Sequence, residues 1–158
     1  GLLLFAFFGY GWARPVTINP SNFRSKKWGD ILVSLAGPLA NFLLAVLAAV
    51  VYAVLMDFYA SFRYMNVILG IVDNIIYLNV LLFLLNLIPI PPFDGYHVLK
   101  DLLFRKNVRF FAKYEQYSIF VLFAFVLLGI FDLILRKPAS LVYQRLVSSG
   151  LALLSLFR

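Results

Sequence analysis

The stretch NLIPIPPFDG, residues 86–95, interrupts a chain that is otherwise built from long apolar segments. Its three prolines lack backbone N–H donors, and each one restricts the residue before it to an extended conformation. An α-helix that enters this stretch must therefore end in it. The Asp-Gly pair that closes the stretch, Asp94 and Gly95, is typical of a turn.

The segments around this stretch are long and apolar enough to cross a bilayer. Hydrophobic residues make up 63% of the 158 residues, charged residues only 13%, and the mean hydropathy is +0.93. A membrane-spanning helix needs about 20 apolar residues. We expect spans at roughly 31–56, 67–88 and 117–135, a partial span at 1–10, and a last helix at 138–157 that either spans or lies in the interface. The sequence predicts an all-α, polytopic transmembrane protein with a broken helix at IPIPPFDG.

The net charge of +7 lies mainly in two loops, residues 11–30 and 96–116. By the positive-inside rule both loops are expected to be cytoplasmic, in contact with membrane lipids, and the linker at 57–66 is expected outside. Arg136 and Lys137 conflict with simple alternation, which leaves the last helix unplaced. No basic stretch is interleaved with base-stacking aromatic residues, which argues against nucleic-acid binding. Cysteine is absent, which excludes disulfides and thiolate metal ligands.

Asp94 is the most unusual ionisable residue. Irregular backbone at membrane depth persists only where it is buried in protein or lines a wet cavity. A carboxylate there costs at least about 3 kcal/mol, so it normally faces a partner, an ion or water. A rigid turn that presents a carboxylate suits coordination of a cation such as Zn²⁺. A solvated interfacial turn explains the same residues, and composition leaves both interpretations open.

A second informative stretch is SLAGPLAN, residues 34–41, near the start of the 31–56 span. Its small residues allow another helix to approach closely. Asn41 in this apolar run requires a hydrogen-bond partner across that contact. The stretch predicts a tight helix–helix interface.

Taken together, SLAGPLANF at 34–42 and NLIPIPPFDG at 86–95 resemble the site-2 protease family of zinc intramembrane metalloproteases, in particular its compact bacterial members. GYGWARPVTINPSNFRSKKWGD at 9–30 is similar to the loop before the AGPLAN helix in that family. YEQYSIFVLFAFVLLGIFDLI at 114–134 is similar to its final span, although less distinctive. The resemblance covers nearly the whole chain.

The resemblance implies a zinc-dependent endopeptidase that cleaves transmembrane protein substrates by metal-activated water, in the bacterial inner membrane. It makes Asp94 a zinc ligand and Asn86 a substrate-binding residue. Phe93 replaces the leucine that usually precedes Asp-Gly. Five further residues would be structural elements near the site: Gly37, Pro38, Asn41, Pro89 and Gly95.

One departure from the family pattern is serious. The family's other two zinc ligands and its general-base Glu belong to an H-E-x-x-H helix, and this sequence has a single histidine, His97. Catalytic zinc needs three protein ligands. We therefore expect the 158 residues to form one membrane-embedded protease domain that is incomplete at its N-terminus, with H-E-x-x-H upstream of Gly1. The chain alone would then be inactive.

Two other functions remain open. A non-catalytic pseudoprotease or membrane scaffold would bind transmembrane partners through the surface at which a protease would bind its substrate. A small transporter could use a broken helix, but it is expected to repeat the break, and the sequence contains no such repeat. His97 is expected to bond to backbone or headgroups. Asp73 and Asp132 are expected to be interfacial anchors at the ends of their spans.

Overall fold

The computed structural model describes residues 26–58, 63–103 and 108–155, and all regular secondary structure in these ranges is α-helical. The described helices are α2 (Lys26–Asp57), α3 (Met65–Asn86), α4 (Asp94–Leu103), α5 (Val108–Leu127) and α6 (Ile130–Ser155). The predicted class, an all-α membrane protein with a broken helix, is confirmed. The partial span predicted at residues 1–10 lies outside the described residues.

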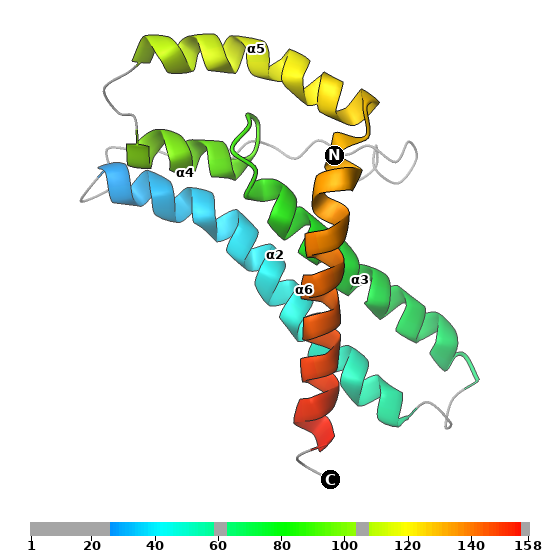
Figure 1. Cartoon of the computed structure of the whole chain (residues 1–158). Helices are drawn as coiled ribbons and strands as arrows, with labels where there is room; N and C mark the ends of the chain where they lie inside the picture. The colour runs from blue at the N-terminus through cyan, green and yellow to red at the C-terminus, as the bar shows by residue number, and fades with distance from the viewer. Residues whose placement is uncertain (1–25, 59–62, 104–107, 156–158) are drawn as a thin grey trace, which may run out of the picture.

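Helices α2 and α3 form an antiparallel hairpin that is the centre of the fold (Figure 1). Both are long and apolar enough to cross a membrane. They cover the predicted span at 31–56 and residues 67–86 of the predicted span at 67–88. Small side chains on α2 lie against branched ones on α3, and the buried cluster contains Ala45, Ala49, Ile76 and Val80. Large apolar side chains such as Leu43 and Leu78 are more than half exposed, as expected for a lipid-facing surface.

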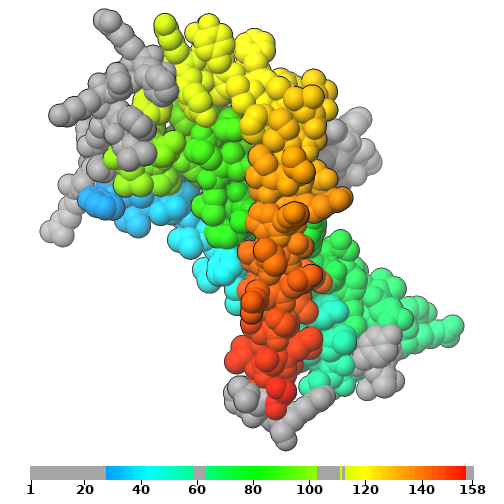
Figure 2. Space-filling view, in the orientation of Figure 1, coloured from blue at the N-terminus to red at the C-terminus, as the bar shows by residue number. Residues whose placement is uncertain are grey.

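Helix α6 crosses the hairpin and covers one face of it (Figure 2). Ala139 is fully buried in the core cluster. A Cβ added to Gly150 would lie 2.9 Å from the carbonyl oxygen of Ala49, so the two backbones are in close contact. Small residues at both positions allow this approach.

The predicted division between a span at 117–135 and a helix at 138–157 differs from the structure. Helix α5 ends at Leu127, and α6 begins at Ile130 and runs through Pro138 without interruption. The chain bends by 72° between the two helices. Gly129 adopts a φ of 65°, which a glycine reaches without the steric cost of a side chain. The break therefore occurs at the glycine and not at the later Arg-Lys-Pro.

Asp73 and Asp132 have different roles in the structure. The half-buried carboxylate of Asp73 accepts a hydrogen bond from the Tyr143 hydroxyl of α6. Asp73 therefore joins α3 to α6, and the expectation that it is an interfacial anchor stays a prediction. Asp132 is exposed and lies 3.5 Å from Arg136, an (i, i+4) ion pair on the surface of α6.

The break between α3 and α4 lies where the prolines predict it. Helix α3 ends at Asn86, the next seven residues form turns, and α4 begins at Asp94. Backbone bonds hold the turns, including Phe93 N–H to the Ile90 carbonyl at 3.0 Å. Ile90 is buried, which anchors the middle of the break. Helix α4 then lies beside the beginning of α2 (Figure 1).

Candidate active site

Asp94 lies in the first turn of α4 and faces α2. Its carboxylate oxygen Oδ2 is 2.8 Å from the position that a Cβ of residue 37 would occupy. Gly37 therefore leaves the space into which the carboxylate fits. The sequence predicted Gly37 as a packing residue near the site, and the structure brings the two motifs into contact at this point.

Gly95 fixes the other side of the same turn. A Cβ at this position would lie 2.4 Å from the carbonyl oxygen of Leu87 and 2.9 Å from that of Ile88. Both atoms belong to backbone, so neither can move aside cheaply. The absence of a side chain at residue 95 allows the beginning of α4 to pack directly on the end of α3. This packing sets the direction in which Asp94 points.

A polar pocket of about 380 Å³ opens beside Asp94. Helix α2 contributes Asp30, Val33 and Ser34 to its lining, and α4 contributes Asp94, His97, Lys100 and Asp101. Burial raises the pKa of Asp94 above the ordinary carboxyl value, while the charge of nearby His97 opposes the shift. Asp94 and His97 thus share one face of α4, as their spacing allows.

The carboxylate of Asp94 has no hydrogen-bond or ion-pair partner within residues 26–58, 63–103 and 108–155, which leaves it available to a further ligand as far as these residues are concerned. The same part of the chain contains no cluster of three or more His, Asp or Glu side chains that could hold a metal ion. The chemistry of Asp94 fits one zinc ligand, but a complete site would need ligands beyond the described residues.

A second pocket, of about 310 Å³ and mostly apolar, adjoins the first at Ser34. It extends along the break, between α2 and α4. Three groups of residues line it: Ser34, Leu35 and Pro38 of α2; Asn86, Leu87 and Pro89 of the break; and Gly95, Val98, Leu99 and Leu102 of α4. The structure therefore places Asn86 in an apolar groove next to the Asp94 pocket.

The remaining residues predicted to lie near the site are less closely involved. Pro38 is fully buried, one residue beyond Gly37. Asn41 is half-buried on α2, and no described residue supplies the hydrogen-bond partner that the sequence led us to expect. Pro89 lines the apolar groove, and its carbonyl oxygen accepts a hydrogen bond from the Tyr114 hydroxyl of α5 at 2.9 Å.

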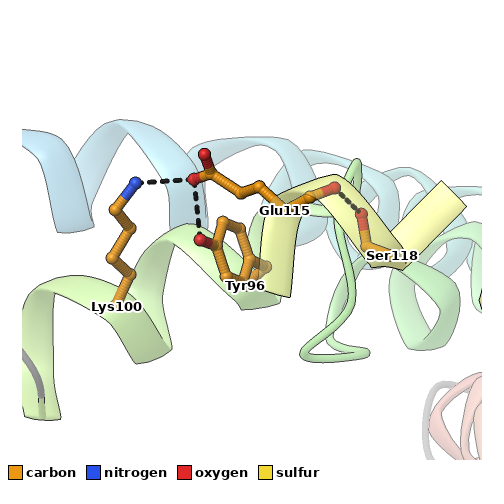
Figure 3. Close-up of polar contacts among 4 residues, drawn as sticks. All are labelled: Tyr96, Lys100, Glu115 and Ser118. Atoms are coloured by element: carbon orange, nitrogen blue, oxygen red, sulfur yellow. Dashed lines mark hydrogen bonds and ion pairs between the residues drawn. The ribbon is translucent and has the colours of Figure 1, made fainter. Parts of the chain in front are cut away.

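Helix α5 supplies contacts to the site region that the sequence did not reveal. Glu115 Oε1 accepts hydrogen bonds from the Tyr96 hydroxyl and from Lys100 Nζ, both at 2.7 Å (Figure 3). Tyr96 is almost completely buried, and its ring stacks on Tyr114 with centroids 5.7 Å apart. Burial and then the bond to Glu115 raise the pKa of Tyr96. No local sequence pattern predicts these contacts, because Tyr96 and Glu115 are 19 residues apart in the chain.

Comparison with known proteins shows similarity to a metallopeptidase family and to one of its bacterial relatives. Residues 58–129 match the family described as Peptidase family M50. The chain is 38% identical over 106 residues, 65% of its length, to a Bacillus subtilis (strain 168) protein named "Putative zinc metalloprotease YwhC". It spans about half of that relative, 48% of its length. No solved structure matches the chain. The matched residues 58–129 include the break, Asp94 and the Tyr96–Glu115 contact.

Proposed function

We propose that the chain is part of a member of the Peptidase M50 (site-2 protease) family, which it matches over residues 58–129, and that it forms part of a zinc-dependent endopeptidase that cleaves transmembrane proteins. Asp94 would be one zinc ligand, and the general base and further ligands would come from an H-E-x-x-H helix outside the described residues. When bound, zinc supplies Lewis acidity and an activated water for peptide-bond hydrolysis. The observation that carries the proposal is the open, partly buried carboxylate of Asp94, held between Gly37 and the end of α3.

The adjoining groove is the proposed substrate site. Its apolar lining suits the side chains of a transmembrane segment, and Asn86 at its edge offers an amide that can donate to and accept from substrate backbone. An extended substrate requires such backbone partners, since its own N–H and C=O groups lose their helical bonds on unwinding. The groove and the Asp94 pocket meet at Ser34, so a segment bound in the groove would pass next to Asp94.

The proposed orientation places this site near the cytoplasmic face of the inner membrane. The beginning of α2 and most of α4, which belong to the two basic loops, lie at the same end of the molecule (Figure 1). The end of α2 and the beginning of α3 lie at the other end. This arrangement agrees with both basic loops facing one compartment. A site at the membrane surface would have the water that hydrolysis consumes.

The test compares Asp94→Asn with Asp101→Asn in the full-length protein. Asp101 is a matched control, because it lines the same pocket on the same helix. We expect Asp94→Asn to lower zinc affinity by more than about 100-fold, since even the partners of metal ligands contribute 10–100-fold. Cleavage of a labelled single-span peptide in vesicles should be lost with it. Asp101→Asn should retain both zinc and cleavage.

Two results would overturn parts of the proposal. Unchanged zinc content in Asp94→Asn would exclude Asp94 as a ligand. A wild-type protein that binds the labelled peptide without cleaving it, at full zinc occupancy, would instead support a pseudoprotease or scaffold that uses the same groove.

A further inference from the structure

We propose that α5 is a positioning element for Asp94, in which Glu115 and Tyr114 hold the two sides of the break that presents the carboxylate. This inference rests on the proposed role of Asp94 in binding zinc. Tyr96, two residues after Asp94, donates to Glu115, and Pro89, five residues before it, accepts from Tyr114. The two anchoring residues are adjacent on α5, so one short segment fixes both sides of the turn.

The burial of Tyr96 makes this contact consequential. Its side chain is 1% exposed, and a buried hydroxyl requires a hydrogen-bond partner. Glu115 provides that partner. The rings of Phe111 and Tyr114 pack against the Tyr96 ring, with centroids 5.9 and 5.7 Å from its centroid. These three neighbours belong to α5, so α5 contacts the side of α4 that carries Tyr96.

The hydrogen bond from Lys100 lowers the pKa of Glu115, which favours the ionised carboxylate that accepts from Tyr96. The Lys100 Nζ atom lies 2.7 Å from the same Oε1 that accepts from Tyr96, and the ammonium group also lies 5.6 Å from the centre of the Tyr96 ring. The side chains of Lys100 and Glu115 are 40% and 44% exposed. An ion pair this exposed contributes little by itself. Its effect here is to orient the acceptor of a buried hydroxyl.

Helix α4 contacts both the polar pocket and α5. Asp94, His97 and Asp101 line the polar pocket against α2, and Lys100 lines it too. Tyr96 and Lys100 bond to Glu115 of α5. Because α4 has only ten residues, a loss of contact on the α5 side transmits to the position of Asp94 within a turn of the helix. Glu115 and Tyr114 line neither the groove nor the Asp94 pocket and act through Tyr96 and Pro89, so they are positioning residues.

The experiment measures hydrogen exchange in α4 of the full-length protein, with and without zinc. We expect Glu115→Ala and Tyr96→Phe each to speed exchange at the amides of residues 95–100 by about fivefold, the equivalent of one net hydrogen bond. Exchange in the α2–α3 hairpin should not change. Glu115→Gln should restore most of the protection, because its amide oxygen still accepts from Tyr96. The exposed neighbour Gln116, changed to Ala, is the matched control.

Zinc affinity provides the second measurement. Glu115→Ala should weaken zinc binding by about three- to tenfold, while Glu115→Gln should leave zinc affinity near that of the wild type. The double variant Glu115→Ala/Tyr96→Phe should bind zinc no more weakly than either single variant, because both changes remove the same hydrogen bond. Unchanged exchange in α4 of the Glu115→Ala protein would overturn the positioning role. The exchange measured in the absence of zinc tests the positioning role by itself. Its outcome stays valid even if Asp94→Asn shows that the ligand assignment is wrong.

Discussion

The carboxylate of Asp94 occupies the space that a side chain at Gly37 would fill, with Oδ2 2.8 Å from the missing Cβ position. The two residues belong to separate motifs, one within the long helix α2 and one after the proline-rich break. Their contact explains why the AGPLAN segment lies at the site and also why its glycine matters there. A residue with a side chain at position 37 would compete with the carboxylate for the same volume.

Gly37→Ala should disable the site without unfolding the protein. The atom in the way is the end of the Asp94 side chain, which can rotate, and alanine favours the helix over glycine by about 1 kcal/mol. We expect the free energy of unfolding to change by less than about 1 kcal/mol, while zinc affinity falls at least about tenfold. Thermal unfolding and zinc titration measure the two effects. Gly70→Ala on α3, which meets no atom within 4 Å, is the control and should leave zinc affinity unchanged.

Gly95→Ala should have the opposite profile. The new Cβ would meet the Leu87 carbonyl at 2.4 Å, and these backbone atoms cannot rotate away. We expect a loss of stability of about 1–3 kcal/mol or more, because α4 must separate from the end of α3. Denaturant unfolding in detergent measures it, and limited proteolysis should show faster cutting at residues 87–95. A variant as stable as wild type would mean that α4 is not packed on α3 in this way.

Asp94→Asn should stabilise the metal-free protein near neutral pH. Burial raises the pKa of Asp94 in the folded state, so the folded protein holds this proton to a higher pH than the unfolded chain does. The associated stability is present below the ordinary carboxyl pKa and is lost as pH rises through the raised value. Asparagine carries no charge to desolvate and avoids that loss.

The measurement is thermal unfolding with a chelator present, at a series of pH values that rises from the ordinary carboxyl pKa of about 3.9 to about pH 8. Asp94→Asn should gain on wild type mainly at the higher pH values, and Asp101→Asn provides the control for removing one acid from the same pocket. An equal difference at every pH value would contradict the assignment of the effect to ionisation of Asp94.

Tyr143→Phe should loosen α6 from the hairpin. The Tyr143 hydroxyl donates to the half-buried carboxylate of Asp73, and bonds to charged groups contribute about 1.5–3 kcal/mol. We expect a stability loss of that order and faster exchange in α6, with α4 unaffected. Tyr77 stacks edge-on against Tyr143 at 6.1 Å, so Tyr77→Phe is a matched control that keeps the ring. Equal loss in both variants would attribute the effect to the loss of a tyrosine hydroxyl in general and not to the Asp73 bond, because both variants keep their rings.

Much of the fold could be predicted from local sequence. Three prolines end α3 by removing backbone donors, wherever the rest of the chain lies. Long uncharged runs predict α2 and α3 because their length and apolarity match a bilayer. The bend before α6 was predicted at the wrong place, since Arg136 and Lys137 look like the end of a span. Gly129 carries the bend, and a lone glycine in an apolar run does not reveal which φ it adopts.

The sequence by itself determined that a membrane helix ends shortly before the Asp94 carboxylate, because prolines act through their own covalent geometry. It did not determine what faces that carboxylate. Only the tertiary structure placed Gly37 opposite Asp94 and joined Tyr96 to Glu115, since these pairs depend on how separate helices pack. Packing brings together residues far apart in the chain, and no spacing along the sequence encodes the volume left between them.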